Sequence, residues 1–327
     1  MNGMLIEVIL VIIGFALIVA GAEFLIEGSS SLARRFGISE FIIGLTIVGM
    51  GTSAPEMVVS YIGALKGNSD IATGDVYGSN IFNILFVLGL TAVISPIAVS
   101  GKTLRKEIPI CFAATALTVL LGMKHRLFGV GSDVFGRIEG LFFILLFAVQ
   151  MILAFRDRKA APETDTAESG SDSPKTAPIW KSILYVAAGF AGLIFGGQMI
   201  VDHAVNIARM LNVSDKFIAI TLLAGGTSFP ELATCVIAAF KKKDQLALGN
   251  ILGSNIFNIL LILGGAAIIH PLDFANINML DTSVFVLSVI LVWLSAYTWK
   301  KGYIDRKDGI VMVLADLAYL FFLTRQL

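Results

Sequence analysis

The chain has 327 residues, of which 56% are hydrophobic and only 15% are charged; its mean hydropathy is +0.85. About a quarter of the residues of a soluble domain are charged, so this composition excludes an ordinary soluble protein and predicts a membrane protein. The formal net charge is zero and no basic run is interleaved with aromatic residues, which argues against a nucleic-acid-binding surface.

Apolar segments of about the length that crosses a bilayer recur along the whole chain. They predict ten transmembrane helices, at about residues 4–26, 41–65, 71–95, 108–124, 136–155, 180–201, 216–240, 246–270, 280–299 and 308–324. The first lacks a basic leader and a small-residue cleavage site, so it is expected to remain as a span. Residues 157–178 show no apolar periodicity and are expected to form a disordered linker.

Basic residues gather on one side of these predicted spans, and this side should be cytoplasmic. Both termini are then expected outside. The basic side collects 17 of the 24 Lys and Arg residues: Arg34, Arg35, Lys102, Arg105, Lys106, Arg156, Arg158, Lys159, Lys175, Lys181, Lys241, Lys242, Lys243, Lys300, Lys301, Arg306 and Lys307.

The chain contains an internal repeat. A shift of 175 residues aligns positions 14–97 with positions 189–272 without a gap, and 32 of the 84 aligned positions are identical. Five helices per half would place the second half upside down relative to the first. The sequence therefore predicts an all-α polytopic membrane protein of ten transmembrane helices in two inverted five-helix repeats, divided into residues 1–156, a cytoplasmic linker at 157–178, and residues 179–327.

The strongest repeated block is Gly-Thr-Ser-x-Pro-Glu, which ends at Glu56 and at Glu231. A charged side chain in mid-span costs roughly 2.5–3.5 kcal/mol on insertion scales, so two at equivalent positions indicate function rather than packing. Pro55 and Pro230 predict a helix break beside each glutamate. Substrate sites of inverted-repeat transporters lie near the membrane midplane on such broken helices.

The second repeated block runs Gly-Ser-Asn-Ile-Phe-Asn-Ile-Leu from Gly78 and again from Gly253. Glycine lets helices approach closely and asparagine can bridge between helices. We therefore favour a packing role for Gly78, Gly253, Asn80 and Asn255.

The polar atoms that the motifs supply are all oxygens. They come from the two glutamates, from carbonyls freed at the breaks (those of Gly51 and Gly226), and from the side chains of Thr52, Ser53, Thr227, Ser228, Asn83 and Asn258. Neither Cys nor His falls in the motifs, which argues against softer metals; Cys111 and Cys235 are interpreted as small buried hydrophobic residues. A dehydrated oxygen cage favours Ca²⁺ over Mg²⁺, with Na⁺ as a monovalent ion of similar size. One Ca²⁺ neutralises two ionised glutamates, so Na⁺ in the same oxygens would compete with it, and no resident cofactor is predicted.

The paired motifs resemble the α-repeats of the Ca²⁺/cation antiporter superfamily, and most closely its prokaryotic sodium/calcium exchangers. The resemblance covers nearly the whole chain. It implies that Ca²⁺ lies between Glu56 and Glu231, that exchange is electrogenic, and that the first and sixth helices slide across the other eight. It also implies that Na⁺ is held by the same carboxylates and by Thr52, Ser53, Ser79, Asn83, Thr227, Ser228, Ser254, Asn258 and the carbonyls of Gly49 and Ala224.

Two positions, one that differs from some family members and one that differs between the two repeats, bear on which ions are coupled. Some members have Asp where this chain has Asn258, and that Asp accompanies K⁺ co-transport or a protonated site; Asn therefore argues for K⁺ independence. Asp75 occupies the position where the second repeat has Asn250. Asp75, Ser79 and Asn83 are spaced by four and share one helix face. Asp75 then either lines the outward approach to the site and attracts cations, or is a solvated acid near the membrane surface.

The main alternative function is Ca²⁺/H⁺ antiport, with the two glutamates alternating between cation and proton. A cation channel would show a ring or a re-entrant filter rather than two inverted broken helices. An enzyme is not expected, because the motifs pair no nucleophile with a base and contain no H-E-x-x-H. The predicted location is a prokaryotic cell membrane, with Ca²⁺, Na⁺ and the lipid bilayer as partners and no protein partner.

Overall fold

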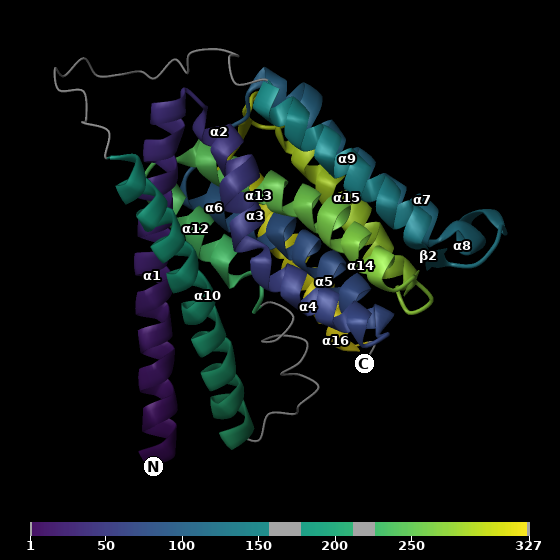
Figure 1. Ribbon diagram of the computed structural model, residues 1–327, viewed down its shortest axis with the longest axis horizontal. Helices are drawn as coiled ribbons and strands as arrows, with labels where there is room; N and C mark the ends of the chain where they lie inside the picture. Colours follow the sequence, from purple (N-terminus) through teal and green to yellow (C-terminus); the bar gives the residue numbers. More distant parts are fainter. Residues whose placement is uncertain (1, 157–177, 212–225, 326–327) are drawn as a thin grey trace.

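The computed structural model describes residues 2–156, 178–211 and 226–325, and this part of the chain is mostly helical (Figure 1). Its α-helices are α1 (Asn2–Phe36), α2 (Glu40–Ile43), α3 (Gly49–Thr52), α4 (Ala54–Leu65), α5 (Ser69–Phe82), α6 (Gly89–Ile94), α7 (Ile108–Gly122), α8 (Lys124–Phe128), α9 (Arg137–Arg156), α10 (Ile179–Met210), α12 (Phe229–Phe240), α13 (Asp244–Phe257), α14 (Gly264–Ile269), α15 (Met279–Ser295) and α16 (Arg306–Arg325). Four π-helical turns are η1 (Gly44–Val48), η2 (Asn83–Leu88), η3 (Thr103–Glu107) and η6 (Asn258–Leu263), and four two-residue strands are β1 (Ile97–Ala98), β2 (Val134–Phe135), β3 (Leu272–Asp273) and β4 (Tyr303–Ile304).

Five helical segments of the described residues are long and apolar enough to cross a membrane alone, and the bent pair 40–52 and 54–65 makes a sixth. The helices Phe229–Phe240 and Met279–Ser295 are apolar but shorter. Each of the ten predicted spans contains a described helix. Residues 216–225 of the predicted seventh span, and residues 157–177 of the predicted linker, lie outside the described residues.

Helices α1 and α10 form a long pair beside the rest of the molecule (Figure 1). They run antiparallel, because Gly14 lies against Gly196, Gly21 against Gly189, and Gly28 against Ser182. A Cβ atom added at Gly21 would lie only 2.7 Å from the Leu193 nitrogen, so the backbones are in direct contact there.

Both helices are longer than the predicted spans 4–26 and 180–201. At 1.5 Å per residue, the 35 residues of α1 extend over about 50 Å, whereas a bilayer core is about 30 Å thick. The pair therefore tilts or reaches beyond the hydrocarbon. The predicted spans are shorter than the helices because hydropathy marks only the apolar part of a helix, and it falls where the polar segment at the end of α1 begins.

The repeat seen in the sequence recurs in the elements. A shift of 175 residues carries α4, α5, η2, α6 and β1 onto α12, α13, η6, α14 and β3 with identical lengths. The short strands pair between the halves: Ile97 lies opposite Ile304 in the β1–β4 pair, and Phe135 opposite Leu272 in the β2–β3 pair. Each half therefore supplies one strand to each of the two pairs.

Helix α13 is the centre of the core, with every residue from Leu246 to Phe257 buried. Glycines allow it to approach the α2–η1–α3 segment: a Cβ at Gly44 would lie 2.4 Å from the Leu246 oxygen, and one at Gly253 would lie 2.3 Å from the Leu45 oxygen. The predicted packing role of Gly253 is therefore confirmed. A Cβ at Gly78 would meet no described atom within 4 Å, and residue 220, the counterpart of Leu45 in the repeat, lies outside the described residues.

Candidate functional site

The repeated Gly-Thr-Ser-x-Pro-Glu block forms a helix break in the first half. Helix α3 ends at Thr52, Ser53 leaves the helical conformation (φ −81°, ψ 10°), and α4 begins at Ala54. The axis bends by 47° at this point. Ser228, with φ −89° and ψ 8°, occupies the same place before α12. The predicted break is therefore present in the first half, and its second copy has the same geometry at the serine.

Each proline lies in the first turn of the helix that follows its break. The missing amide hydrogen is not needed there, because first-turn amides have no partner within the helix. One expectation about the breaks is wrong: the Gly226 carbonyl is not free, since it accepts a hydrogen bond from the Phe229 amide at 3.3 Å. A tight turn satisfies this oxygen before α12 begins.

Glu56 and Glu231 occupy the first turns of α4 and α12 and are both 0% exposed. The positive end of a helix dipole favours a carboxylate at this position. Each glutamate accepts a hydrogen bond from the serine of the opposite break: Ser53 Oγ donates to Glu231 Oε1 at 2.8 Å, and Ser228 Oγ donates to Glu56 Oε1 at 3.0 Å. The serine of each repeat therefore forms a hydrogen bond with the buried glutamate of the other repeat.

The other carboxylate oxygen, Oε2, has no hydrogen-bond partner in either glutamate within the described part of the chain. Among the same residues neither glutamate forms an ion pair with Lys, Arg or His. Each lies within electrostatic range of the other. Two buried acids without a basic partner require another source of positive charge, either a bound cation or a proton.

A group of oxygens from both halves surrounds Glu231. Ser254 donates to Glu231 Oε1 and lies 3.3 Å from both this atom and the Gly49 carbonyl. Thr52 Oγ1 lies 3.4 Å from Gly49 O and 3.1 Å from Asn250 Oδ1. Four of the predicted ligands, Thr52, Gly49, Ser254 and Glu231, therefore meet at one place.

The remaining predicted side chains are buried without all of their hydrogen bonds. Ser79, Asn83 and Asn258 are at most 1% exposed. Ser79 Oγ and both amide atoms of Asn83 and Asn258 have no partner among the described residues. An unpartnered buried polar atom is costly, so such a concentration marks a place where further ligands are expected. Thr227 is half-buried at the second break, and Ala224 lies outside the described residues.

Both asparagines of the pair Asn83 and Asn258 begin a π-helical turn, η2 in the first half and η6 in the second. Single π-turns inside α-helices widen the backbone and frequently occur at functional sites. The sequence did not predict these turns, since no residue pattern specific to a π-turn marks them.

Asp75 and its counterpart Asn250 have different surroundings. Asp75 is partly exposed, accepts a 2.7 Å hydrogen bond from Ser60, and lies within electrostatic range of Glu56 and Glu231. Asn250 is fully buried between Thr52 and Cys235, whose Sγ is 3.3 Å from its Nδ2. The Asn250–Thr52 contact is not predicted by the sequence motifs, although Asn250 lies four residues before Ser254 on the same face of α13.

Asn80 and Asn255 each donate a hydrogen bond to a backbone carbonyl. Asn80 Nδ2 donates to the Val76 carbonyl at 2.7 Å, and Asn255 Nδ2 lies 3.4 Å from the Asn80 carbonyl of the other half. Only the Asn255 bond bridges two helices as predicted, and the Oδ1 atoms of both side chains are buried without a hydrogen-bond partner among the described residues. Cys111 and Cys235 are free and buried.

The described residues contain no group of three or more His, Cys, Asp or Glu side chains close enough together to hold a metal ion. The candidate site instead combines two carboxylates with hydroxyl, amide and carbonyl oxygens. This donor set suits hard cations that take many oxygen ligands, such as Ca²⁺ and Na⁺.

Comparison with known proteins places the chain among ion exchangers. The sequence profile of the sodium/calcium exchanger protein family matches residues 6–156 and 181–325. The protein named as antiporter CaxA from Alkalimonas amylolytica is 38% identical over 324 residues, covering 98% of this chain and 99% of CaxA. Inner membrane protein YrbG from Escherichia coli is 32% identical over 327 residues, covering 97% and 98%. The solved structure of the sodium-calcium exchanger NCX_Mj, soaked with Na⁺ and Ca²⁺, superposes with a TM-score of 0.81 at 30% identity and covers 98% of each chain.

Proposed function

Because the chain belongs to the sodium/calcium exchanger protein family, we propose that it is a secondary antiporter that exchanges Na⁺ for Ca²⁺ across the membrane by alternating access. The observation that carries this proposal is the reciprocal pair of hydrogen bonds between Ser53 and Glu231 and between Ser228 and Glu56. They bring two buried acids, which lack a basic partner among the described residues, to the interface of two equivalent half-sites.

Charge accounts for competition between the two ions. Two ionised glutamates carry a charge of −2, which one Ca²⁺ neutralises. Several Na⁺ ions can occupy the same oxygens, but not together with Ca²⁺, because the charges would repel strongly in a medium of low dielectric constant. A site that either Ca²⁺ or Na⁺ fills, and that opens to one side at a time, exchanges one ion for the other.

The ligand assignment follows the oxygens described above. We assign Ca²⁺ to the space between Glu56 and Glu231, and Na⁺ to the same carboxylates together with Thr52, Ser53, Ser79, Asn83, Thr227, Ser228, Ser254, Asn258 and the carbonyls of Gly49 and Ala224. Asn83 and Asn258 add no charge. This neutrality favours exchange that is independent of K⁺, and a Na⁺ load whose charge exceeds that of Ca²⁺ makes the exchange electrogenic.

The proposed topology is ten transmembrane helices in two inverted five-helix repeats, residues 1–156 and 179–327, joined by a cytoplasmic linker at 157–178, with both termini outside. The antiparallel α1–α10 pair and the exchange of strands between the halves support it. So does the concentration of basic residues on one side. The location is then a cell membrane, and the α1–α10 pair is the element that slides.

Asp75 is proposed to line the outward approach to this site. In the proposed topology α5 begins at the outer face, and Asp75 lies between that end and Ser79. Its partial exposure and its electrostatic interaction with both glutamates support a cation-attracting role.

Ca²⁺/H⁺ antiport is the second candidate function. The unpartnered Oε2 atom of each glutamate favours it, because a proton on that atom would also neutralise the buried charge. The protein would then bind either Ca²⁺ or two protons.

Radioactive Ca²⁺ uptake into proteoliposomes separates these functions when Na⁺, K⁺ and H⁺ gradients are imposed one at a time. We expect uptake to follow an outward Na⁺ gradient, to respond to membrane voltage, and to be unaffected by K⁺. Uptake driven by a pH gradient alone would establish the second candidate, and uptake without any counter-ion gradient would indicate a channel.

A further inference from the structure

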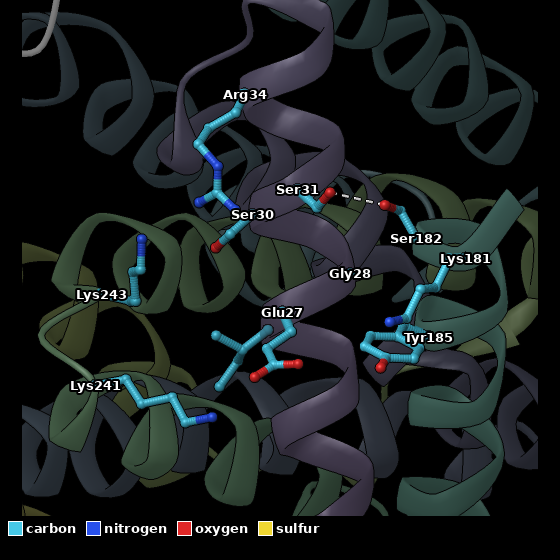
Figure 2. A pocket seen from close by; sticks show the side chains of 11 residues that line it. Glu27, Gly28, Ser30, Ser31, Arg34, Lys181, Ser182, Tyr185, Lys241 and Lys243 are labelled. Atoms are coloured by element: carbon cyan, nitrogen blue, oxygen red, sulfur yellow. Dashed lines mark hydrogen bonds between the residues drawn. The ribbon is translucent and has the colours of Figure 1, made fainter. Parts of the chain in front are cut away.

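A basic pocket of about 360 Å³ opens where α1 ends, α10 begins and α12 turns into α13 (Figure 2). Its lining residues Lys241 and Lys243 follow the C-terminal end of α12, whereas Glu231 lies in the first turn of that helix. Its lining includes Ser30 and Arg34 of α1, Lys181 and Tyr185 of α10, and Lys241 and Lys243 of the turn after α12. The proposed antiport uses none of these side chains.

The charges of this pocket do not cancel. Lys241 pairs with Glu23 at 3.3 Å and Lys243 pairs with Glu40, and the lining also contains Glu27. Within the part of the chain that the structure describes, neither Arg34 nor Lys181 forms an ion pair. Four cations therefore face three carboxylates. Lys181 lies 5.3 Å from the centre of the Tyr185 ring, but neither it nor Arg34 has a carboxylate partner among the described residues, so both can interact with an anion.

Hydrogen-bond donors accompany these cations. Ser30 is 3% exposed, and its Oγ has no partner among the described residues. Figure 2 shows the guanidinium of Arg34 directed toward Ser30, and Lys181 approaching from α10 beside Gly28, where α1 carries no side chain. Helix α10 begins here at Ile179 without a side-chain cap, so its positive dipole end adds to the field.

Exposed apolar side chains cover the first turns of α10, on the face turned away from the pocket residues Lys181, Ser182 and Tyr185. Trp180 is 65% exposed, and Ile183 and Leu184 on the next turn of α10 are also exposed. Tryptophan is enriched at the boundary between lipid headgroups and hydrocarbon, which places the pocket at headgroup depth. Basic pockets between transmembrane helices on the cytoplasmic side suit anionic headgroups.

We propose that this pocket binds the phosphate-bearing headgroup of an anionic phospholipid, whose acyl chains extend into the surrounding hydrocarbon. The headgroup would accept hydrogen bonds from Arg34, Lys181 and Ser30. Because the pocket is lined by the α1–α10 pair and by the turn between α12 and α13, the bound lipid links the pair to the core. The inference rests on the proposed membrane orientation but not on which ions are exchanged.

Trp180 provides the test, since the chain has only two other tryptophans. In a Trp293→Phe, Trp299→Phe background, the protein is placed in phosphatidylcholine nanodiscs that contain either brominated phosphatidylglycerol or brominated phosphatidylcholine, and quenching of Trp180 is measured. Brominated phosphatidylglycerol should quench several-fold more strongly at equal content. Arg34→Gln and Lys181→Gln should each reduce this preference by about fivefold. Lys301→Gln, an exposed lysine on the same predicted side, is the matched control and should leave it unchanged.

Native mass spectrometry of the natural sequence gives an independent measurement if the double-Phe background folds poorly: bound phosphatidylglycerol should be retained and should be lost from the Arg34 and Lys181 variants. Equal quenching by the two brominated lipids, or insensitivity to both variants, would overturn the proposal. If millimolar inorganic phosphate abolishes the phosphatidylglycerol signal, the pocket would instead be assigned to a soluble anion.

Discussion

Ser53 of the first helix break donates a 2.8 Å hydrogen bond to Glu231 of the second, and the equivalent Ser228 returns one to Glu56 at 3.0 Å. The two bonds are related by the 175-residue repeat, so each half of the chain holds the carboxylate of the other. Neither half-site is complete in its own repeat, and the cation-binding geometry depends on the contact between them.

The serines are the first test of this arrangement. A hydrogen bond to a charged group contributes about 1.5–3 kcal/mol, so Ser53→Ala and Ser228→Ala should each weaken apparent Ca²⁺ affinity by about tenfold to a hundredfold. Ser288→Ala removes a buried hydroxyl whose one hydrogen-bond partner among the described residues is the Phe285 carbonyl, and should change affinity less than twofold. The Ca²⁺ dependence of flux measures these affinities. A loss of affinity in only one of the two serine variants would contradict the reciprocal arrangement.

Glu56→Gln and Glu231→Gln should each abolish Ca²⁺ transport. Losing one charge of a buried ionic contact costs about 3–5 kcal/mol, which corresponds to a more than hundredfold loss of Ca²⁺ affinity. The same variants should unfold at an equal or higher temperature than the natural protein in cation-free detergent, because an uncompensated buried charge is gone. Ca²⁺ should raise the Tm of the natural protein and not that of either variant. Surviving transport in either variant would remove that glutamate from the site.

Asp75→Asn makes the two repeats alike at this position. Loss of one negative charge from the proposed outer approach should weaken apparent Ca²⁺ and Na⁺ affinity at that face by about threefold to tenfold at low ionic strength, and less at high salt. Affinity at the inner face should not change. Sided flux measurements check this, and unchanged affinity at the outer face would leave Asp75 as a solvated acid with no role in access.

Gly21→Ala should separate α1 from α10, because the added Cβ would lie 2.7 Å from the Leu193 nitrogen and 2.9 Å from the Gly189 oxygen. Overpacking of this kind typically costs about 1–3 kcal/mol, so the Tm in detergent should fall by several degrees. Gly3→Ala lies on the same helix and meets only the Met210 side chain at 3.8 Å. It should leave the Tm unchanged, and equal Tm values for both variants would argue against close packing at Gly21.

Single cysteines test the proposed orientation. In a background lacking Cys111 and Cys235, Lys66→Cys in the turn between α4 and α5 should react with a membrane-impermeant maleimide added outside intact cells. Lys242→Cys in the turn between α12 and α13 should react only after permeabilisation. Both lysines are exposed, so accessibility to water is matched. The reverse labelling pattern would place both termini in the cytoplasm.

The sequence predicted the helix breaks and the helical segments because each has a local or periodic cause. Pro55 and its neighbouring glycines mark a break whatever surrounds them, and apolar runs mark spans. The fate of the Gly226 carbonyl could not be predicted, because it depends on how tightly the turn to Phe229 closes.

Other features needed the tertiary structure. The contact of Asn250 with Thr52 depends on how deeply α13 packs against α3, which Gly253 and Leu45 decide. The π-turns at Asn83 and Asn258 shift hydrogen bonds by one residue without a distinctive residue pattern. The basic pocket joins three elements that are far apart in the chain, so no single segment of sequence could show it.

The exchange of strands has an evolutionary consequence. Strand β1 pairs with β4 of the second half, and β2 pairs with β3. A shorter ancestor with a single repeat would have had both strand edges and one carboxylate unmatched. It could have completed them by pairing with a second copy of itself inserted in the opposite direction. Fusion of two such genes would then fix the antiparallel partnership within one chain and free each copy to diverge, as Asp75 and Asn250 have done.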